Sequence, residues 1–129
     1  MKVLALDYGS ARTGVAVSDE TGTLARPVGV VERASTRAGL ERVAELVVEH
    51  GAERVVVGLP LTLKGERGEQ ARETEAYATA LAEVVSVPVE LYDERFTTAL
   101  AARTPSSDMP EDALAAAHLL AGYLERVGA

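Results

Sequence analysis

The feature that most constrains the fold is an apolar segment near the start of the chain, which ends in an acid and a glycine. Residues 2–8 are rich in valine and leucine and lack polar alternation, which is typical of a strand buried on both faces of a sheet. Asp7 follows four apolar residues, where a carboxylate is costly unless something compensates its charge. The segment therefore predicts a central strand whose carboxyl-terminal end carries an aspartate.

A tight turn is expected directly after this strand. Gly9 and Gly14 allow a sharp turn and close approach of a ligand to the backbone, and Arg12 lies between them. Residues 14–18 are expected to pair back onto the first strand across this turn. The hairpin thus offers a carboxylate, bare backbone and a guanidinium, which together suit a metal ion and a phosphate group.

The remainder of the chain alternates between predicted strands and helices. Further strands are expected at residues 23–32, 54–60 and 87–94, and Pro27 indicates that the first of these lies at a sheet edge. Helical spacing of apolar residues predicts helices before Gly51 and over residues 70–85, 97–103 and 111–127. Three consecutive strands followed by alternating helices and strands predict an α/β fold, with a mixed five-stranded sheet flanked by helices.

Composition narrows the class of protein. A chain of 129 residues suits one domain, spanning residues 1–129. The net charge of -7, from 13 basic and 20 acidic residues, weighs against nonspecific nucleic-acid binding but allows a local basic site. The absence of cysteine excludes thiolate metal sites, and two histidines argue against zinc. No apolar run approaches the ~20 residues that cross a membrane, so we expect a cytoplasmic protein without a membrane partner.

Three acids from distant parts of the chain are expected close together, at the carboxyl-terminal ends of the parallel strands. Parallel strands end side by side, so Asp7 should lie near the adjacent pair Asp93 and Glu94. These two side chains point to opposite faces of their strand, so one of them faces Asp7. Asp112, in the first turn of the last predicted helix, lies at the edge of the helix's apolar stripe and is expected to face inward.

Close carboxylates favour a divalent cation. Two of them repel by roughly 4 kcal/mol at about 4 Å with an effective dielectric near 20, and a cation relieves that repulsion. Oxygen ligands favour Mg²⁺ or Mn²⁺, and three acids would suit a two-metal cradle for attack on a phosphodiester. Simpler roles are also open. Asp7 could serve only to form the turn, and the negative charge of Asp112 could serve only to interact favourably with the helix dipole. The two histidines, His50 and His118, are interpreted as helix residues without a catalytic role.

Four segments together resemble the YqgF family of ribonuclease-H-like nucleases. Residues 7–16 are similar to its opening motif, and Gly58-Leu59-Pro60 followed by Gly65 resembles its second block. Residues 93–98 resemble its third and most distinctive block, and residues 112–124 its final helix. Each segment alone is weak, but their order and spacing span nearly the whole chain, which makes the combination specific.

The resemblance implies a ribonuclease-H-like fold and a nuclease that matures the 5′ end of the small-subunit (16S) ribosomal RNA precursor. It implies that the metal-binding, catalytic acids are Asp7, Glu94 and Asp112. The candidates for substrate binding are Gly9, Arg12, Lys64, Arg95 and Thr97. The resemblance implies that Arg12, Arg95 and Thr97 support either the phosphate or the acids. One departure from the family is the short segment Ala99 to Glu111, which carries a single base, Arg103, and leaves the grip on the substrate open.

The sequence leaves several functions open. The leading one is a Mg²⁺- or Mn²⁺-dependent endonuclease that acts on structured RNA, with ribosomal precursor particles as potential partners. A resolvase of branched DNA would need a dimer to cut two strands symmetrically. A nucleic-acid- or ribosome-associated binding protein with little catalysis would suit the acidic charge. Actin-like ATPases also open with an acid-glycine hairpin, but this chain is too short for the two lobes that enclose ATP.

Overall fold

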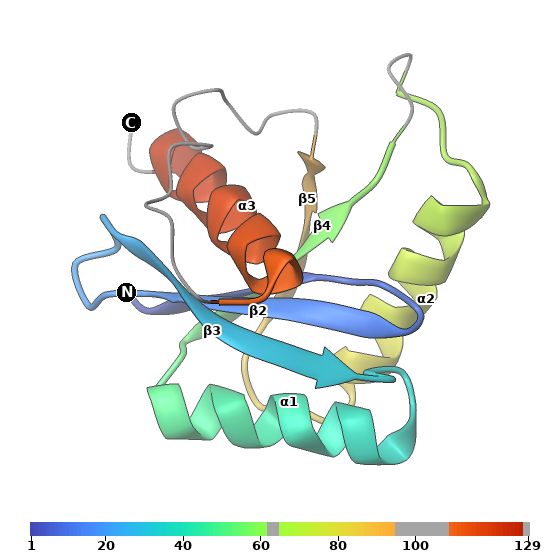
Figure 1. Ribbon diagram of the computed structural model, residues 1–129, viewed down its shortest axis with the longest axis horizontal. Coiled ribbons are helices and arrows are strands. Elements are labelled where there is room, and N and C mark those ends of the chain that lie inside the picture. Colours follow the sequence, from blue (N-terminus) through green and yellow to red (C-terminus); the bar gives the residue numbers. More distant parts are fainter. Residues whose placement is uncertain (62–64, 95–108, 128–129) are drawn as a thin grey trace.

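The computed structural model describes residues 1–61, 65–94 and 109–127, which form a five-stranded sheet with helices on both faces (Figure 1). The strands are β1 (Val3–Asp7), β2 (Arg12–Ser18), β3 (Ala25–Glu32), β4 (Arg54–Leu59) and β5 (Val89–Asp93). Their order across the sheet is β3-β2-β1-β4-β5; β2 is antiparallel to both neighbours, whereas β4 and β5 run parallel to β1. The predicted mixed sheet is confirmed, and Pro27 lies in the edge strand β3 as expected.

The helices in the described ranges are α1 (Arg37–His50), α2 (Glu69–Ala82) and α3 (Glu111–Val127). Thr36 begins α1 by accepting a hydrogen bond from the backbone amide of Gly39 at 3.1 Å. Gly51 ends α1 with φ of 64°, a left-handed conformation that favours glycine, as predicted. None of the helices in this part of the chain combines the length and the apolar character that crossing a membrane requires.

Some element boundaries differ from those expected. β2 begins two residues earlier than predicted, at Arg12, because pairing with β3 extends down to the hairpin. α2 ends at Ala82, three residues before the predicted end, and β5 starts at Val89, just after Pro88. The short helix predicted over residues 97–103 lies outside the described residues.

Alternation along the strands divides the core into two layers. Leu4 and Leu6 point toward α1 and α2, where both are fully buried. Val3 and Ala5 point to the opposite face, which α3 covers (Figure 1). The α3 layer also contains Ala16, Val56, Tyr92, Ala116, Ala117, Leu119, Leu120, Tyr123 and Leu124. Asp7 continues the Val3–Ala5 alternation, so it belongs to the face that α3 covers.

A glycine brings the start of α3 against the sheet. A side chain at Gly14 would overlap the backbone carbonyl of Asp112, so only glycine allows this approach. Gly14 is also the register partner of Asp7 in the β1–β2 ladder. The first turn of α3 is therefore held next to the carboxyl end of β1.

Candidate active site

The carboxyl ends of β1 and β5 bring two acids into contact. Glu94 directly follows β5 and shares the strand face on which Tyr92 packs against α3. The side chains of Asp7 and Glu94 are joined by a hydrogen bond. Of the two adjacent acids at the end of β5, Glu94 rather than Asp93 thus faces Asp7.

Gly58 makes room for this contact. It lies on β4, the strand between β1 and β5, and a Cβ atom there would sit 2.5 Å from Oε1 of Glu94. The same Cβ would sit 2.9 Å from Cδ2 of Leu119 on α3. The missing side chain therefore lets Glu94 cross over β4 and reach Asp7.

Burial raises the pKa of both carboxyl groups. For Asp7 the largest cause of the raised pKa is loss of water, and the negative charge of Asp112 acts in the same direction. Burial, followed by the charge and hydrogen bond of Asp7, raises the pKa of Glu94 to about 7. Because ionising both carboxyl groups side by side costs free energy, the pair retains a proton to a higher pH than a solvated carboxyl group would. A divalent cation would displace that proton.

We expect the melting temperature of the metal-free protein to fall as pH rises from about 5 to about 8. The folded pKa of Glu94 lies above its ordinary value of 4.5, so between 4.5 and about 7 the folded state binds more protons than the unfolded state. This contribution to stability is complete below the ordinary pKa and is lost as pH rises through the folded pKa. Calorimetry without metal should show the slope, and excess Mg²⁺ should restore the melting temperature at pH 8.

The control for this prediction is Glu94→Gln, which cannot titrate. Its melting temperature should vary less with pH than that of the wild type over the same range. An equal slope in both proteins would show that other groups cause the pH dependence.

Asp112 lies near the pair but is engaged by Arg12. Nε of Arg12 lies 3.2 Å from Oδ2 of Asp112, and the two side chains are 63% and 33% exposed. Exposed ion pairs contribute little, about 0–1 kcal/mol, so this one can open at small cost. Within the described ranges no three histidine or acidic side chains lie close enough to hold one metal ion. The expected convergence of three acids on one ion is therefore not seen, and metal binding by Asp7, Glu94 and Asp112 stays a prediction.

The carboxylate pair nevertheless fits magnesium or manganese. Mg²⁺ is commonly held by one or two carboxylates and completes its shell with waters and substrate phosphates. Asp7 and Glu94 present hydrogen-bonded oxygens whose mutual repulsion a cation would relieve. Opening of the Arg12–Asp112 ion pair would make a third carboxylate available.

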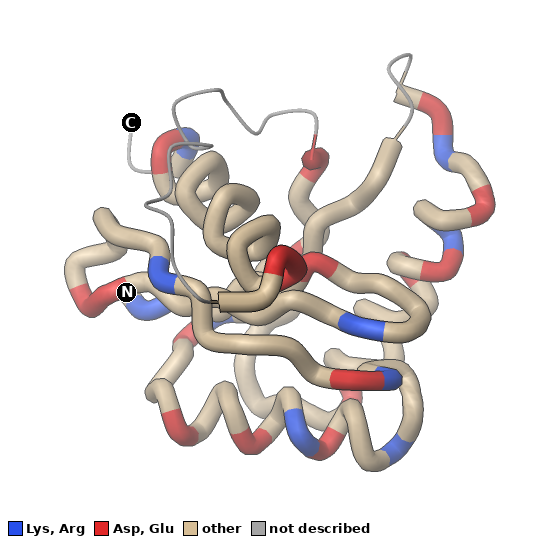
Figure 2. The backbone as a smooth tube through the Cα atoms, in the orientation of Figure 1, with Lys and Arg blue, Asp and Glu red and all other residues tan. Residues whose placement is uncertain are grey.

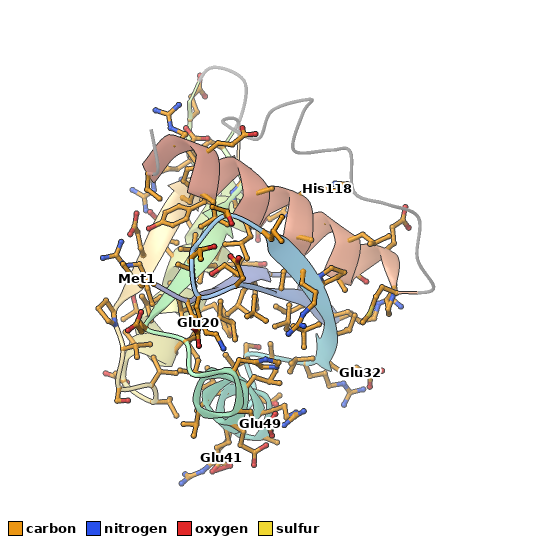
Figure 3. The ribbon with its side chains drawn as sticks, turned by 90° about the vertical axis from the view of Figure 1, so that its left-hand side faces the viewer. Met1, Glu20, Glu32, Glu41, Glu49 and His118 are labelled. Atoms are coloured by element: carbon orange, nitrogen blue, oxygen red, sulfur yellow. The ribbon has the colours of Figure 1, made fainter. Side chains whose placement is uncertain are left out.

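A pocket of about 260 Å³ opens beside the pair. It is lined by Asp7, Glu94, Ala115, His118 and Leu119. Nε2 of His118 is buried and has no hydrogen-bond partner in the described part of the chain. Figure 3 labels this residue on α3. Sequence reasoning missed the placement of His118; the available signal was its position one turn after Ala115 on the helix that carries Asp112.

The remaining predicted site residues divide into two groups. Gly9 forms the tight β1–β2 turn, where a Cβ atom would lie 2.5 Å from the carbonyl oxygen of Arg12. Close packing of the turn therefore requires a glycine here, and a role of Gly9 in substrate binding stays a prediction. Lys64, Arg95 and Thr97 lie outside the described residues, so their substrate-binding roles stay predictions.

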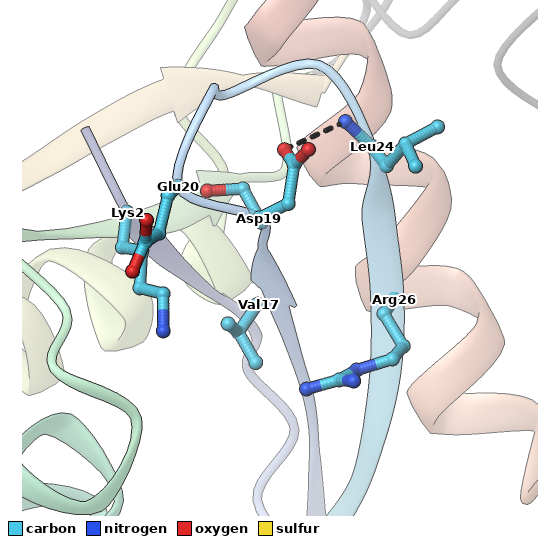
Figure 4. A pocket seen from close by; sticks show the side chains of 7 residues that line it. Lys2, Val17, Asp19, Glu20, Leu24 and Arg26 are labelled. Carbon is cyan, nitrogen blue, oxygen red and sulfur yellow. Dashed lines mark hydrogen bonds between the residues drawn. The ribbon is translucent and has the colours of Figure 1, made fainter.

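A second pocket, of about 360 Å³, lies at the opposite end of β1 (Figure 4). Lys2, Glu20 and Arg26 are among its lining residues, so it mixes basic and acidic groups. The carboxylate of Asp19 in this pocket accepts hydrogen bonds from the backbone amides of Thr23 at 2.9 Å and Leu24 at 3.1 Å. Asp19 thus closes the β2–β3 turn, which is a structural role.

The order of the strands and the helices on both faces define a ribonuclease-H-like fold. RuvC of T. thermophilus in complex with a Holliday junction has this fold, with a TM-score of 0.63 at 24% identity, covering 99% of this chain and 96% of that one. A fowlpox virus resolvase solved with junction DNA gives a TM-score of 0.59 at 12% identity, covering 98% and 99% of the two chains. Both likenesses concern the fold.

Residues 1–126 match the model of the RuvX family, described as Holliday junction resolvase, and the chain belongs to this family. RuvX is the YqgF family, so the resemblance found in the sequence is confirmed. A relative named "Putative pre-16S rRNA nuclease" from Moorella thermoacetica is 38% identical over 136 residues, covering 99% of this chain and 97% of that protein. A relative of the same name from Chloroflexus aurantiacus is 43% identical over 99 residues. The match covers 77% of this chain but only 65% of the length of that relative.

Proposed function

We propose that this chain is a Mg²⁺- or Mn²⁺-dependent endonuclease that hydrolyses phosphodiester bonds in structured RNA, during 5′-end processing of pre-16S ribosomal RNA. The observation that carries the proposal is the hydrogen-bonded Asp7–Glu94 pair beside a pocket. The relatives that match this chain over nearly their whole length are named as pre-16S rRNA nucleases, which supports the choice of RNA. Because this substrate is transcribed in the cytoplasm, we place the activity there, with ribosomal precursor particles as partners.

In this mechanism Asp7 and Glu94 would give up the proton between them and would hold the cation. A bound divalent cation would supply charge stabilisation at the scissile phosphate. The apolar side chains of Ala115 and Leu119 line the helix side of the pocket. Arg12 is largely exposed beside the site, so its guanidinium is free to exchange Asp112 for a substrate phosphate.

The distribution of charge supports a substrate with few phosphate contacts. In Figure 2 the basic residues of the described segments are interspersed with acidic ones, and acidic segments mark the end of β5 and the start of α3. A protein that grips four converging duplex arms needs a broad positive surface. The arrangement suits one flexible RNA strand better.

A second candidate is resolution of Holliday junctions in DNA. The family description and the fold shared with junction-bound resolvases favour it. This activity requires two sites at a fixed separation, and hence a stable symmetric dimer. The oligomeric state is therefore a direct discriminator between the two candidates.

We expect the purified protein to cleave a pre-16S RNA fragment in Mg²⁺ or Mn²⁺ and to leave a synthetic four-way DNA junction without symmetric cuts. Both substrates should be supplied at matched protein and metal concentrations, with EDTA as the metal-free control. Symmetric cutting of the junction with intact RNA would replace the RNA proposal by the resolvase. Binding of RNA without cleavage of either substrate would favour a binding protein.

A further inference from the structure

His118 lies in the proposed site without having been assigned any role. It is half-buried on α3 and lines the same pocket as Asp7 and Glu94. Its neighbours along this side of the helix, Ala115 and Leu119, are apolar and cannot pair with an imidazole. The pocket therefore has two carboxylates on the sheet side and one nitrogen heterocycle on the helix side.

The unpaired Nε2 atom of His118 requires an explanation. This atom is buried, and it has no hydrogen-bond partner among the residues that the structure describes. Buried polar atoms in folded proteins are paired in the great majority of cases, because an orphaned group loses its water without compensation. A leucine of similar size would fill the same space on α3 without that cost. The position is therefore better suited to a ligand than to packing.

The chemistry of the pocket identifies the ligand class. Carboxylates can only accept hydrogen bonds when ionised, so they cannot hold a phosphate directly, whereas an imidazole N–H can donate to it. We propose that His118 is a substrate-contacting residue whose Nε2–H donates a hydrogen bond to an oxygen of the RNA phosphate next to the Asp7–Glu94 pair. This inference rests on the proposed function and adds a specific phosphate contact to it.

The test compares three substitutions that differ in where they place a donor. His118→Gln keeps an amide nitrogen close to the position of Nε2, His118→Asn is too short to do so, and His118→Leu removes the donor. RNA affinity should be measured in Ca²⁺ to suppress cleavage, and kcat and KM in Mg²⁺. The other histidine, His50, ends α1 on the far face of the sheet, so His50→Asn is the matched control.

We expect His118→Asn and His118→Leu to weaken RNA affinity by about 10-fold to 100-fold, the usual size of one hydrogen bond to a charged group. His118→Gln and His50→Asn should stay close to wild type. The ligand-free His118→Leu protein should also melt at a higher temperature than wild type, because the orphaned nitrogen is gone. A merely structural histidine would show the opposite shift in melting temperature.

Each other outcome overturns the inference. Wild-type RNA affinity in His118→Asn and His118→Leu, with wild-type cleavage intact, refutes the phosphate contact and leaves the proposed function standing. Equal losses in all three variants, together with lower melting temperatures, assign His118 to packing. If the wild type itself neither binds nor cleaves RNA, the proposed function fails and the inference fails with it.

Discussion

Asp7→Asn is expected to reduce metal-dependent cleavage by on the order of 10³-fold, equivalent to about 4 kcal/mol of lost transition-state stabilisation. The substitution keeps the shape of the side chain but removes one of the two buried carboxylates. In the metal-free protein it also removes the repulsion by Asp7, which after burial is the next largest cause of the raised pKa of Glu94. The melting temperature without metal should therefore rise, while the increase caused by Mg²⁺ in the wild type should largely disappear.

Both effects are measured on one preparation, by single-turnover cleavage and by thermal melting with and without Mg²⁺. Asp93→Asn is the matched control, because it makes the same chemical change on the adjacent residue, which lies on the other face of β5. It should retain cleavage and should not raise the metal-free melting temperature to the same extent. Cleavage by Asp7→Asn at the wild-type rate would refute the role of the carboxylate pair.

Gly58→Ala is expected to lower cleavage by about 10-fold to 100-fold, in the range seen when the supports of metal ligands are changed. The added methyl group would come within 2.5 Å of Oε1 of Glu94 and 2.9 Å of Cδ2 of Leu119. Both atoms are the ends of flexible side chains, so the protein should fold while Glu94 turns away from Asp7. Mg²⁺ affinity should fall together with activity.

Gly29→Ala is the matched control for this substitution. Gly29 also lies in a strand, on β3 at the sheet edge, and a Cβ atom there has no neighbour within 4 Å. Its activity and Mg²⁺ affinity should equal those of the wild type. Full activity and metal affinity in a folded Gly58→Ala protein would show that the Asp7–Glu94 contact is not required.

Local pattern accounts for the part of this site that lies on the sheet. The unbroken apolar run before Asp7 indicates a central strand. Strand alternation places the side chains of Asp93 and Glu94 on opposite faces of their strand, and the parallel direction of the strands brings one of them near Asp7. The left-handed end of α1 at Gly51 likewise depends on one residue and its immediate neighbours. Such features are determined over a few residues, so they can be predicted from sequence.

The part contributed by α3 depends on packing between distant segments. The ion pair of Arg12 with Asp112 exists because Gly14 admits the first turn of α3 against β2. The entry of His118 into the pocket follows from the same docking of α3. Helical periodicity alone cannot specify how far a helix is rotated on a sheet. Periodicity therefore indicated an inward Asp112, whereas only the family resemblance suggested that Arg12 supports the acids.

The contact of Gly14 with α3 also has a consequence for protein synthesis. Asp7 lies on β1 and α3 spans Glu111–Val127, so Asp7 is synthesised long before the helix that covers this face of the sheet. Until α3 docks, a nascent chain has no wall of Ala115 and Leu119 beside the carboxylates, and Asp7 remains open to water. The pocket is thus complete only once α3 has been synthesised and has docked on the sheet.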